Sequence, residues 1–282
     1  MIWSHVTLGG LSLVADPDEH GVRWHCPHST IDGWWSSPGP SPQVEQRQRA
    51  HGVWVGESWL PGRAISLRVF IEADTRAQVQ DALDRLHAAA ALTDTLLTIS
   101  DSGQDQSAVV RRSGEVSVRW IHHRLAQCTV LLLAADPRKL GPALTASTGL
   151  PSSSGGLTVP LAVPFSIDST VSSGLVSLVN PGTIDGPVSL RIDGPVSAPR
   201  VTHVNSGRSL VFASSLALSA GEWITVDMQR REVLAQGQAS RMQWVTSREW
   251  SAFEPGVNTW AFSSDGSVPG GSLTVDASPA WM

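Results

Sequence analysis

The chain has 282 residues, of which 41% are hydrophobic and 16% charged, and its formal net charge is −5. This length favours two domains, each with enough apolar residues to bury a core of its own. Nucleic-acid binding needs clustered lysines and arginines to neutralise phosphates, so the low and slightly acidic charge argues against it.

The start of the chain has no pattern of a secretory signal, because Met1–His5 contain no basic segment and no apolar run follows them. The most apolar window, residues 129–135, is far too short to cross a bilayer. We therefore expect a soluble protein that is made in the cytoplasm and does not insert into a membrane.

A cluster of potential metal ligands comes next, with His25, Cys26 and His28 close together in sequence. Imidazole and thiolate are good zinc ligands, but a structural zinc site needs a second ligand pair at a defined spacing. The adjacent His122 and His123 do not supply it, because neighbouring side chains on a strand point to opposite faces. We expect no metal and no other cofactor, and interpret these residues as ordinary loop and sheet histidines.

Two cysteines, Cys26 and Cys128, are far apart in the sequence and cannot form a dense disulfide framework. The expected state is two unpaired thiols in the core. A fold that brought them together would allow a bridge, and that alternative stays open.

Trp34 and Trp35 stand side by side at the edge of a proline-rich loop, residues 36–42. Two neighbouring indoles cannot both point inward from a strand. We take both as candidate interface residues and expect one of them to meet a partner surface, as large aromatic side chains do at subunit interfaces. A loop folded back on its own domain would also hide it.

Residues 1–146 are predicted to form one β-rich α+β domain. Strict alternation of apolar residues over 65–72 predicts a strand, and helical spacing from Asp74, a candidate N-cap, to about Leu92 predicts a helix. This helix is expected to pack its apolar stripe on a sheet or barrel. Further strands are predicted at residues 96–99, which end in the turn 101–103, and at 116–120 and 128–133, which one long hairpin would join.

Residues 147–160 are mostly Ser, Gly, Thr and Pro, which predicts a connection between domains. From residue 161 to 282, strand-like segments recur between glycine, proline and asparagine turns, which is typical of an antiparallel β-sandwich. The clearest segments are residues 189–192, 221–227, 232–235 and 254–260.

Several tryptophans lie in this C-terminal block. An exposed indole can stack on a sugar ring, and Trp250 and Trp260 are candidates for a weak saccharide contact. Burial in the core or at an interface is the favoured alternative, because indoles carry a large apolar area. By alternation, Trp223 should face opposite Ile224, and Trp260 should share its face with Phe262.

The sequence contains no GxSxG, HExxH, Walker or GxGxxG motif. We therefore expect no enzyme and assign no catalytic residue. A hydrolase whose triad is dispersed along the chain is the weakest alternative, since such triads leave no local signal.

Read in order, these segments resemble the distal tail proteins of siphophages, the bacteriophages with long, flexible, non-contractile tails, and especially those that infect actinobacteria. The resemblance covers most of the chain and rests on pattern rather than on one motif. Its most specific stretches are residues 218–227 and 253–258, and others are residues 6–11, 63–71, 135–137, 179–182 and 187–194.

The resemblance implies a virion protein that forms a hexameric ring at the tail tip and is assembled in the host cytoplasm. The N-terminal domain would build the ring and meet the tail tube protein and the tail-associated hub protein. The C-terminal domain would be a galectin-like antiparallel β-sandwich that serves as a platform for receptor-binding and baseplate proteins. From the residues alone, a non-catalytic carbohydrate-binding β-sandwich protein stays open as the alternative.

Overall fold

A computed structural model describes residues 5–154, 170–265 and 270–282. The chain divides into two compact units, Met1–Gly141 with Met282 (unit 1) and Pro142–Trp281 (unit 2). Of the predicted connection 147–160, residues 147–149 lie in strand β13 (Leu144–Gly149) and residues 152–154 form β14 (Ser152–Ser154), whereas 155–160 lie outside the described residues. The predicted domain bounds stay a prediction.

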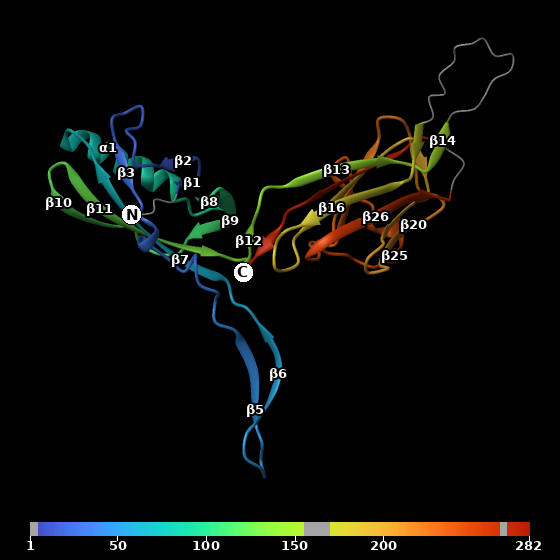
Figure 1. Cartoon of the computed structure of the whole chain (residues 1–282), viewed down its shortest axis with the longest axis horizontal. Helices are drawn as coiled ribbons and strands as arrows, with labels where there is room; N and C mark the ends of the chain where they lie inside the picture. Colours follow the sequence, from blue (N-terminus) through green and yellow to red (C-terminus); the bar gives the residue numbers. More distant parts are fainter. Residues whose placement is uncertain (1–4, 155–169, 266–269) are drawn as a thin grey trace. The chain divides into compact units, whose positions relative to one another are not determined.

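Unit 1 is built on an antiparallel sheet with the strand order β2-β1-β8-β9-β11-β7-β3, and β10 and β4 pair with β11 and β7 (Figure 1). The bounds are β1 (His5–Leu8), β2 (Leu11–Leu13), β3 (Arg23–His25), β4 (Ile31–Asp32), β7 (Arg63–Glu72), β8 (Thr95–Asp101), β9 (Gln104–Arg112), β10 (Ser117–His122), β11 (Leu125–Ala134) and β12 (Lys139–Leu140), with a 3₁₀ turn at His28–Thr30. Alternate residues of β7 are buried, as its period-two pattern predicts, and β10 pairs antiparallel with β11 as one hairpin.

Helix α1 (Arg76–Ala89) covers the core of unit 1. Its stripe of Val79, Leu83 and Leu86 is buried, so the predicted packing is confirmed. The predicted N-cap was wrong, because Thr75 and not Asp74 caps the helix. The Thr75 hydroxyl accepts a hydrogen bond from the Gln78 backbone N–H, and Oε1 of the Gln78 side chain accepts one from the Thr75 backbone N–H.

Unit 2 is a sandwich of two antiparallel sheets, with the orders β13-β27-β17-β22-β23-β24 and β16-β26-β19-β20-β25. Their further strands are β16 (Leu175–Asn180), β17 (Val188–Asp193), β19 (Pro199–His203), β20 (Ser209–Phe212), β22 (Trp223–Asp227), β23 (Glu232–Ala235), β24 (Ala239–Ser240), β25 (Val245–Arg248), β26 (Gly256–Ser264) and β27 (Ser272–Ala277). Smaller ladders use β14 with β15 (Thr170–Ser172) and β18 (Val196–Ser197) with β21 (Ala217–Leu218), and β28 (Ala280–Trp281) is the last of the described strands.

In the sandwich, Trp223, Ile224, Trp260 and Phe262 face the sides that the alternation in the sequence predicts. Ile224 is fully buried while Trp223 is half-buried on the other face, and Trp260 and Phe262 both point into the core. The predicted fold class is confirmed: mainly β, with one α-helix among the described residues and a C-terminal antiparallel sandwich. Over those residues, no helix is long and apolar enough to span a membrane.

Candidate interaction surfaces

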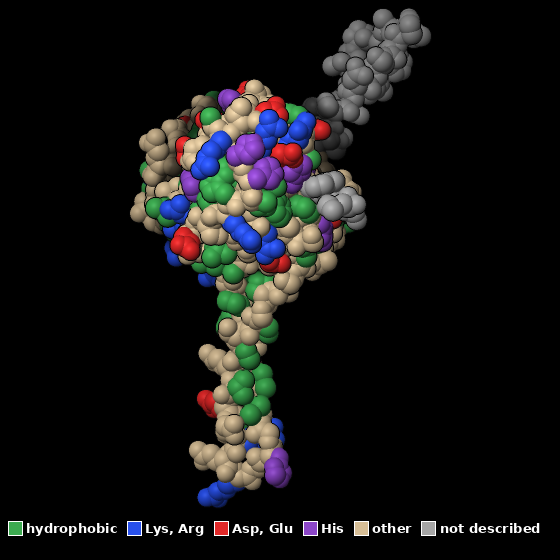
Figure 2. All heavy atoms as spheres, turned by 90° about the vertical axis from the view of Figure 1, so that its left-hand side faces the viewer, with side chains coloured by type: hydrophobic (Ala, Val, Ile, Leu, Met, Phe, Trp, Pro, Cys, Tyr) green, Lys and Arg blue, Asp and Glu red, His purple; other side chains and the backbone are tan. Residues whose placement is uncertain are grey.

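The most exposed element of unit 1 is a two-stranded hairpin of β5 (Ser41–Gln46) and β6 (Val53–Trp59), which we call the arm. Every residue of both strands is exposed, and hydrophobic side chains line much of it in Figure 2. The large apolar side chains of the arm and its end are 36% to 67% exposed: Val44, Val53, Trp54, Val55, Trp59 and Leu60. An isolated two-stranded hairpin is at best marginally stable in water, and exposed apolar side chains of this kind are typical of an interaction surface.

The tip of the arm is basic. Arg47, Arg49 and His51 lie in or beside the turn that joins the strands, and Figure 2 shows their colours at the far end. The Arg47 guanidinium lies 4.5 Å from the centre of the Trp54 ring, a cation–π contact that orders an exposed indole. Gly52, at φ +99°, takes a conformation that favours glycine.

Arg63, the first residue of β7, fixes the root of the arm. Arg63 is only 1% exposed, and its guanidinium donates hydrogen bonds to four backbone carbonyls. Three of these carbonyls lie in residues 33–36 and the fourth is that of Pro137. Nε donates to the Pro137 oxygen at 2.8 Å, and Nη1 donates to the Gly33 oxygen at 2.8 Å, to Trp34 at 3.2 Å and to Ser36. Burial lowers the pKa of Arg63 from its ordinary value, but a guanidinium stays charged.

The two adjacent tryptophans at this root lie in the turn after β4 and differ in burial. Trp34 is fully buried in the core of its own unit, with the Lys139 ammonium 5.9 Å from its ring centre. Burial and the nearby Arg63 charge lower the pKa of Lys139. Trp35 is 37% exposed and stacks on His28 with a centroid distance of 3.9 Å. The candidate interface residue Trp34 is thus hidden by its own domain, and the interface role of Trp35 stays a prediction.

A second apolar surface lies on the outward side of the unit 1 sheet, and we call it the outward face. Leu96 on β8 stands opposite Val109 on β9, and Leu131 and Leu133 follow on β11, which pairs with β9. These four side chains are 42% to 51% exposed. Contiguous exposed apolar side chains on a rigid sheet mark an interaction surface.

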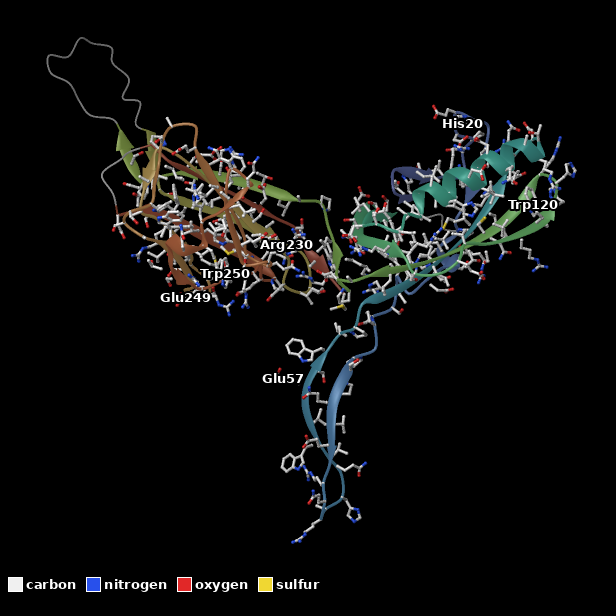
Figure 3. All side chains as sticks on the ribbon, turned by 180° about the vertical axis from the view of Figure 1, so that it is seen from behind. His20, Glu57, Trp120, Arg230, Glu249 and Trp250 are labelled. Carbon is white, nitrogen blue, oxygen red and sulfur yellow. The ribbon has the colours of Figure 1, made fainter. Side chains whose placement is uncertain are left out.

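The two saccharide candidates of unit 2, Trp250 and Trp260, differ in how far they are buried. Trp260 is fully buried, with its ring 5.1 Å from that of His203 and 6.2 Å from that of Phe253. The indole therefore fills the core, and a sugar cannot stack on it in this fold. Trp250 is half-buried against the core next to Glu249 (Figure 3), and its carbonyl accepts from the Arg208 side chain at 3.2 Å. A saccharide role for Trp250 stays a prediction.

His203 is the centre of a buried polar cluster in unit 2 that sequence patterns did not indicate. Its Nδ1 lies 2.7 Å from the Ser206 hydroxyl, and its Nε2 lies 3.1 Å from Oδ1 of Asn258. The Asn258 amide donates to the Glu254 and Gly256 carbonyls at 2.6 and 3.0 Å. Burial lowers the pKa of His203, so the ring is neutral at pH 7. The cluster thus joins the ends of β19 and β26 through side-chain hydrogen bonds.

The potential metal ligands His25, Cys26 and His28 are not brought together with further ligands in the described part of the chain. Among the residues that the structure describes, no group of three or more His, Cys, Asp or Glu side chains is placed to hold a metal ion. His25 lies 3.1 Å from the Glu72 carboxylate. Cys26 and Cys128 are free and buried, which confirms the predicted unpaired thiols, and burial raises the pKa of each to about 11.

Comparison with known proteins gives one family match and a set of shared folds. Residues 182–276 match the family model of the siphovirus-type tail component, C-terminal domain. The crystal structure of the SPP1 Dit protein (gp 19.1), described as a paradigm of the hub adsorption apparatus in Gram-positive infecting phages, is similar with a TM-score of 0.66 and 14% identity over 99% of both chains. A chain of the phage P2 baseplate in its activated conformation with Ca has a TM-score of 0.52 and 9% identity over 98% of both chains. No curated protein sequence matches the chain.

Residues 182–276 thus carry the sequence pattern of a siphovirus-type tail component, and the chain shares its fold with the SPP1 Dit protein. The matched segment contains the stretches that carry the resemblance most specifically. The predicted resemblance to a siphophage distal tail protein is thereby confirmed, by the family match in unit 2 and by the fold of both units.

Proposed function

We propose that six copies of the chain form a ring at the distal end of a siphophage tail tube. The ring joins the tube to the tail tip or baseplate and to the host-recognition proteins. The observation that carries the proposal is that unit 1 bears two uncovered apolar surfaces, the arm and the outward face. The copy number of six comes from the resemblance to distal tail proteins.

A ring of identical subunits explains why one unit carries two different apolar surfaces. In a head-to-tail contact, each copy offers one surface to the neighbour before it and another to the neighbour behind it, and rotation closes the ring. The arm suits such a contact because an extended two-stranded ladder with a fixed root presents a large area for its length. The apolar valines and tryptophans on it lose contact with water once a neighbour covers them.

The proposed partners follow from the same arrangement. Unit 1 meets the tail tube protein on one side of the ring and the tail-associated hub protein on the other, and unit 2 carries receptor-binding or baseplate proteins. The protein is assembled in the host cytoplasm, becomes part of the virion at the tail tip and has no catalytic role. The absence of a catalytic motif in the sequence and the structural class of the matched proteins support this.

Native mass spectrometry of the purified full chain tests the ring. Six copies of the 30.0 kDa chain give an expected mass of about 180 kDa. The double substitution Trp54→Ser, Val55→Ser removes apolar area from the arm and should shift the population to monomers by at least tenfold, because each buried large apolar side chain contributes about 2 kcal/mol. The matched control is Gln43→Ser, which changes an exposed polar residue of the same arm. A wild-type chain that stays monomeric both alone and with the tail tube protein would refute the ring.

A further inference from the structure

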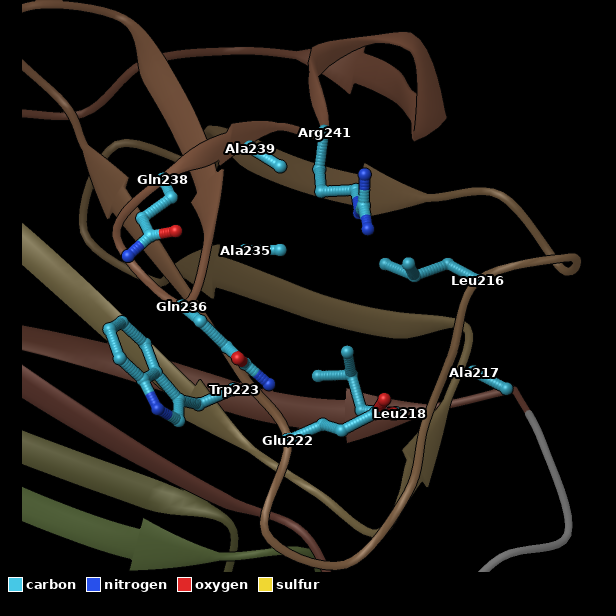
Figure 4. A pocket seen from close by; sticks show the side chains of 10 residues that line it. All are labelled: Leu216, Ala217, Leu218, Glu222, Trp223, Ala235, Gln236, Gln238, Ala239 and Arg241. Atoms are coloured by element: carbon cyan, nitrogen blue, oxygen red, sulfur yellow. The ribbon is translucent and has the colours of Figure 1, made fainter.

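Unit 2 contains a hollow of about 280 Å³ at the β23–β24 end of one sheet (Figure 4). Its apolar lining comes from leucine and alanine side chains, and its polar lining comes from a carboxylate, two amides and a guanidinium. The apolar residues are Leu216, Ala217, Leu218, Ala235 and Ala239, and the others are Glu222, Trp223, Gln236, Gln238 and Arg241.

Two turns hold the walls of the hollow in place. In the first, the Ser219 amide donates to Oε2 of Glu222 at 2.7 Å and the Glu222 amide donates to the Ser219 carbonyl at 3.0 Å. Gly221 in this turn has φ +86°, a conformation that favours glycine. One carboxylate oxygen of Glu222 is thus fixed by the backbone, and the other is left for a ligand.

The second turn presents the amides. The Gln238 amide donates to the Ala235 carbonyl at 3.0 Å, and the two central residues, Gln236 and Gly237, have φ values of +49° and +71°. Positive φ at both central positions is the type I′ hairpin turn, which fits the twist of the strands it joins. The turn therefore sets both glutamines on the rim, and Gln236 does so at a positive φ that favours glycine.

The polar side chains of the rim are available to a ligand. Within the described parts of the chain, the side chains of Gln236, Gln238 and Arg241 make no hydrogen bond to the protein. The Arg241 guanidinium is instead held 4.9 Å from the centre of the Trp244 ring. In Figure 4 the Gln236 and Arg241 side chains extend toward the hollow from opposite sides.

The chemistry of the lining indicates the class of ligand. Glu222 and Arg241 carry opposite charges, so the site offers no net attraction to a phosphate or another anion. Amides, a carboxylate and a guanidinium together bind hydroxyl groups as donors and as acceptors. The leucine and alanine side chains give an apolar surface on which the C–H face of a sugar ring can lie. The volume of about 280 Å³ is just below the range of roughly 300–1,000 Å³ for small-ligand pockets, as suits a single ring.

We propose that this hollow binds one ring of a neutral saccharide. Gln236, Gln238, Arg241 and the second oxygen of Glu222 bind its hydroxyls, and Leu216 and Leu218 contact its apolar face. The site goes beyond the proposed ring function and does not depend on it, because all of its residues lie in unit 2. It also differs in place from Trp250 and Trp260.

Saturation-transfer difference NMR of the full chain tests the proposal, since it observes the ligand and works for a monomer or a ring. The probes are glucose, galactose, rhamnose and N-acetylglucosamine, each at millimolar concentration, and the tripeptide Gly-Leu-Gly. At least one sugar should receive saturation, most strongly at its ring C–H protons. Gln236→Ala should weaken its binding about fivefold, the effect of one lost hydrogen bond. Ala239→Trp, which fills the hollow, should abolish it.

The control is Gln104→Ala, which changes an exposed glutamine of unit 1 and should leave the saturation unchanged. A response that persists in Ala239→Trp would overturn the site, as would no response to any sugar. A response to Gly-Leu-Gly alone would assign the hollow to a protein partner and overturn the saccharide. Native mass spectrometry of the same samples reports the ring separately, so failure of one proposal is distinguished from failure of the other.

Discussion

At the scale of single residues, Arg63 does more for unit 1 than any motif in the sequence indicates. One guanidinium serves the carbonyls of Gly33, Trp34, Ser36 and Pro137. Substitution Arg63→Met leaves these buried acceptors without their donor, and we expect unfolding of unit 1 to become easier by about 3 kcal/mol. Urea denaturation followed by circular dichroism measures the change. Arg68→Met, an exposed position on the same strand, should cost less than about 0.5 kcal/mol, and equal losses in both variants would contradict the role of Arg63.

His203 predicts how unit 2 responds to acid. Burial is the largest cause of its lowered pKa, with the nearby Arg208 charge acting in the same direction, while the hydrogen bond to Asn258 and the Glu254 charge oppose it. The unfolded chain therefore binds a proton more readily than the folded chain. Stability is complete above the ordinary histidine value of 6.5 and falls as the pH drops through and below it.

The measurement is the urea midpoint of unit 2 between about pH 7.5 and pH 5. The wild-type midpoint should decrease on acidification, and His203→Gln should flatten this dependence because it removes the titrating group. His51→Gln, in the exposed turn of the arm, serves as the control and should keep the wild-type slope. The same slope in His203→Gln would show that other groups cause the acid sensitivity.

At the scale of elements, the sequence around α1 predicts the buried face of the helix but not the residue that caps it. Helical spacing predicts its buried stripe, but Asp74 and Thr75 are both good N-cap residues, and only the position of Gln78 decides between them. Thr75→Ala should destabilise unit 1 by about 1 kcal/mol, measured by urea denaturation. Asp74→Ala should have a smaller effect, and the reverse order would restore Asp74 as the cap.

The elements that the sequence predicts well are those with one buried face. β7, β22 and β23 alternate because one side of each is in a core, and the alternation is visible in the residues. The arm has no buried face, so no apolar alternation reveals β5 and β6. Pro38, Pro40 and Pro42 favour a loop, although Ser41 and Pro42 of the predicted loop lie in β5. The root contacts of Arg63 and the cluster around His203 join residues far apart in the chain, which single-sequence patterns do not report. The same holds for the hollow, whose lining converges from separate turns.

At the scale of the whole molecule, each unit has its own hydrophobic core, one around α1 and β7 and one between the sheets of the sandwich. Each core consists of residues of its own unit. The apolar side chains of the arm and of the outward face stay exposed in the single chain. Unit 2 also exposes apolar side chains, among them Val179 and Val257 on the paired strands β16 and β26. The proposed ring uses the two surfaces of unit 1, and the exposed side chains of unit 2 remain for other contacts.

The anchored root of the arm has a consequence for the speed and strength of assembly. Four hydrogen bonds from one buried side chain fix the segment from which the arm starts. Less rotational freedom of the arm remains to be lost when a neighbour binds, and a smaller entropic penalty means tighter association for the same buried area. In the proposed ring, Arg63 thus contributes to affinity between copies that it never touches.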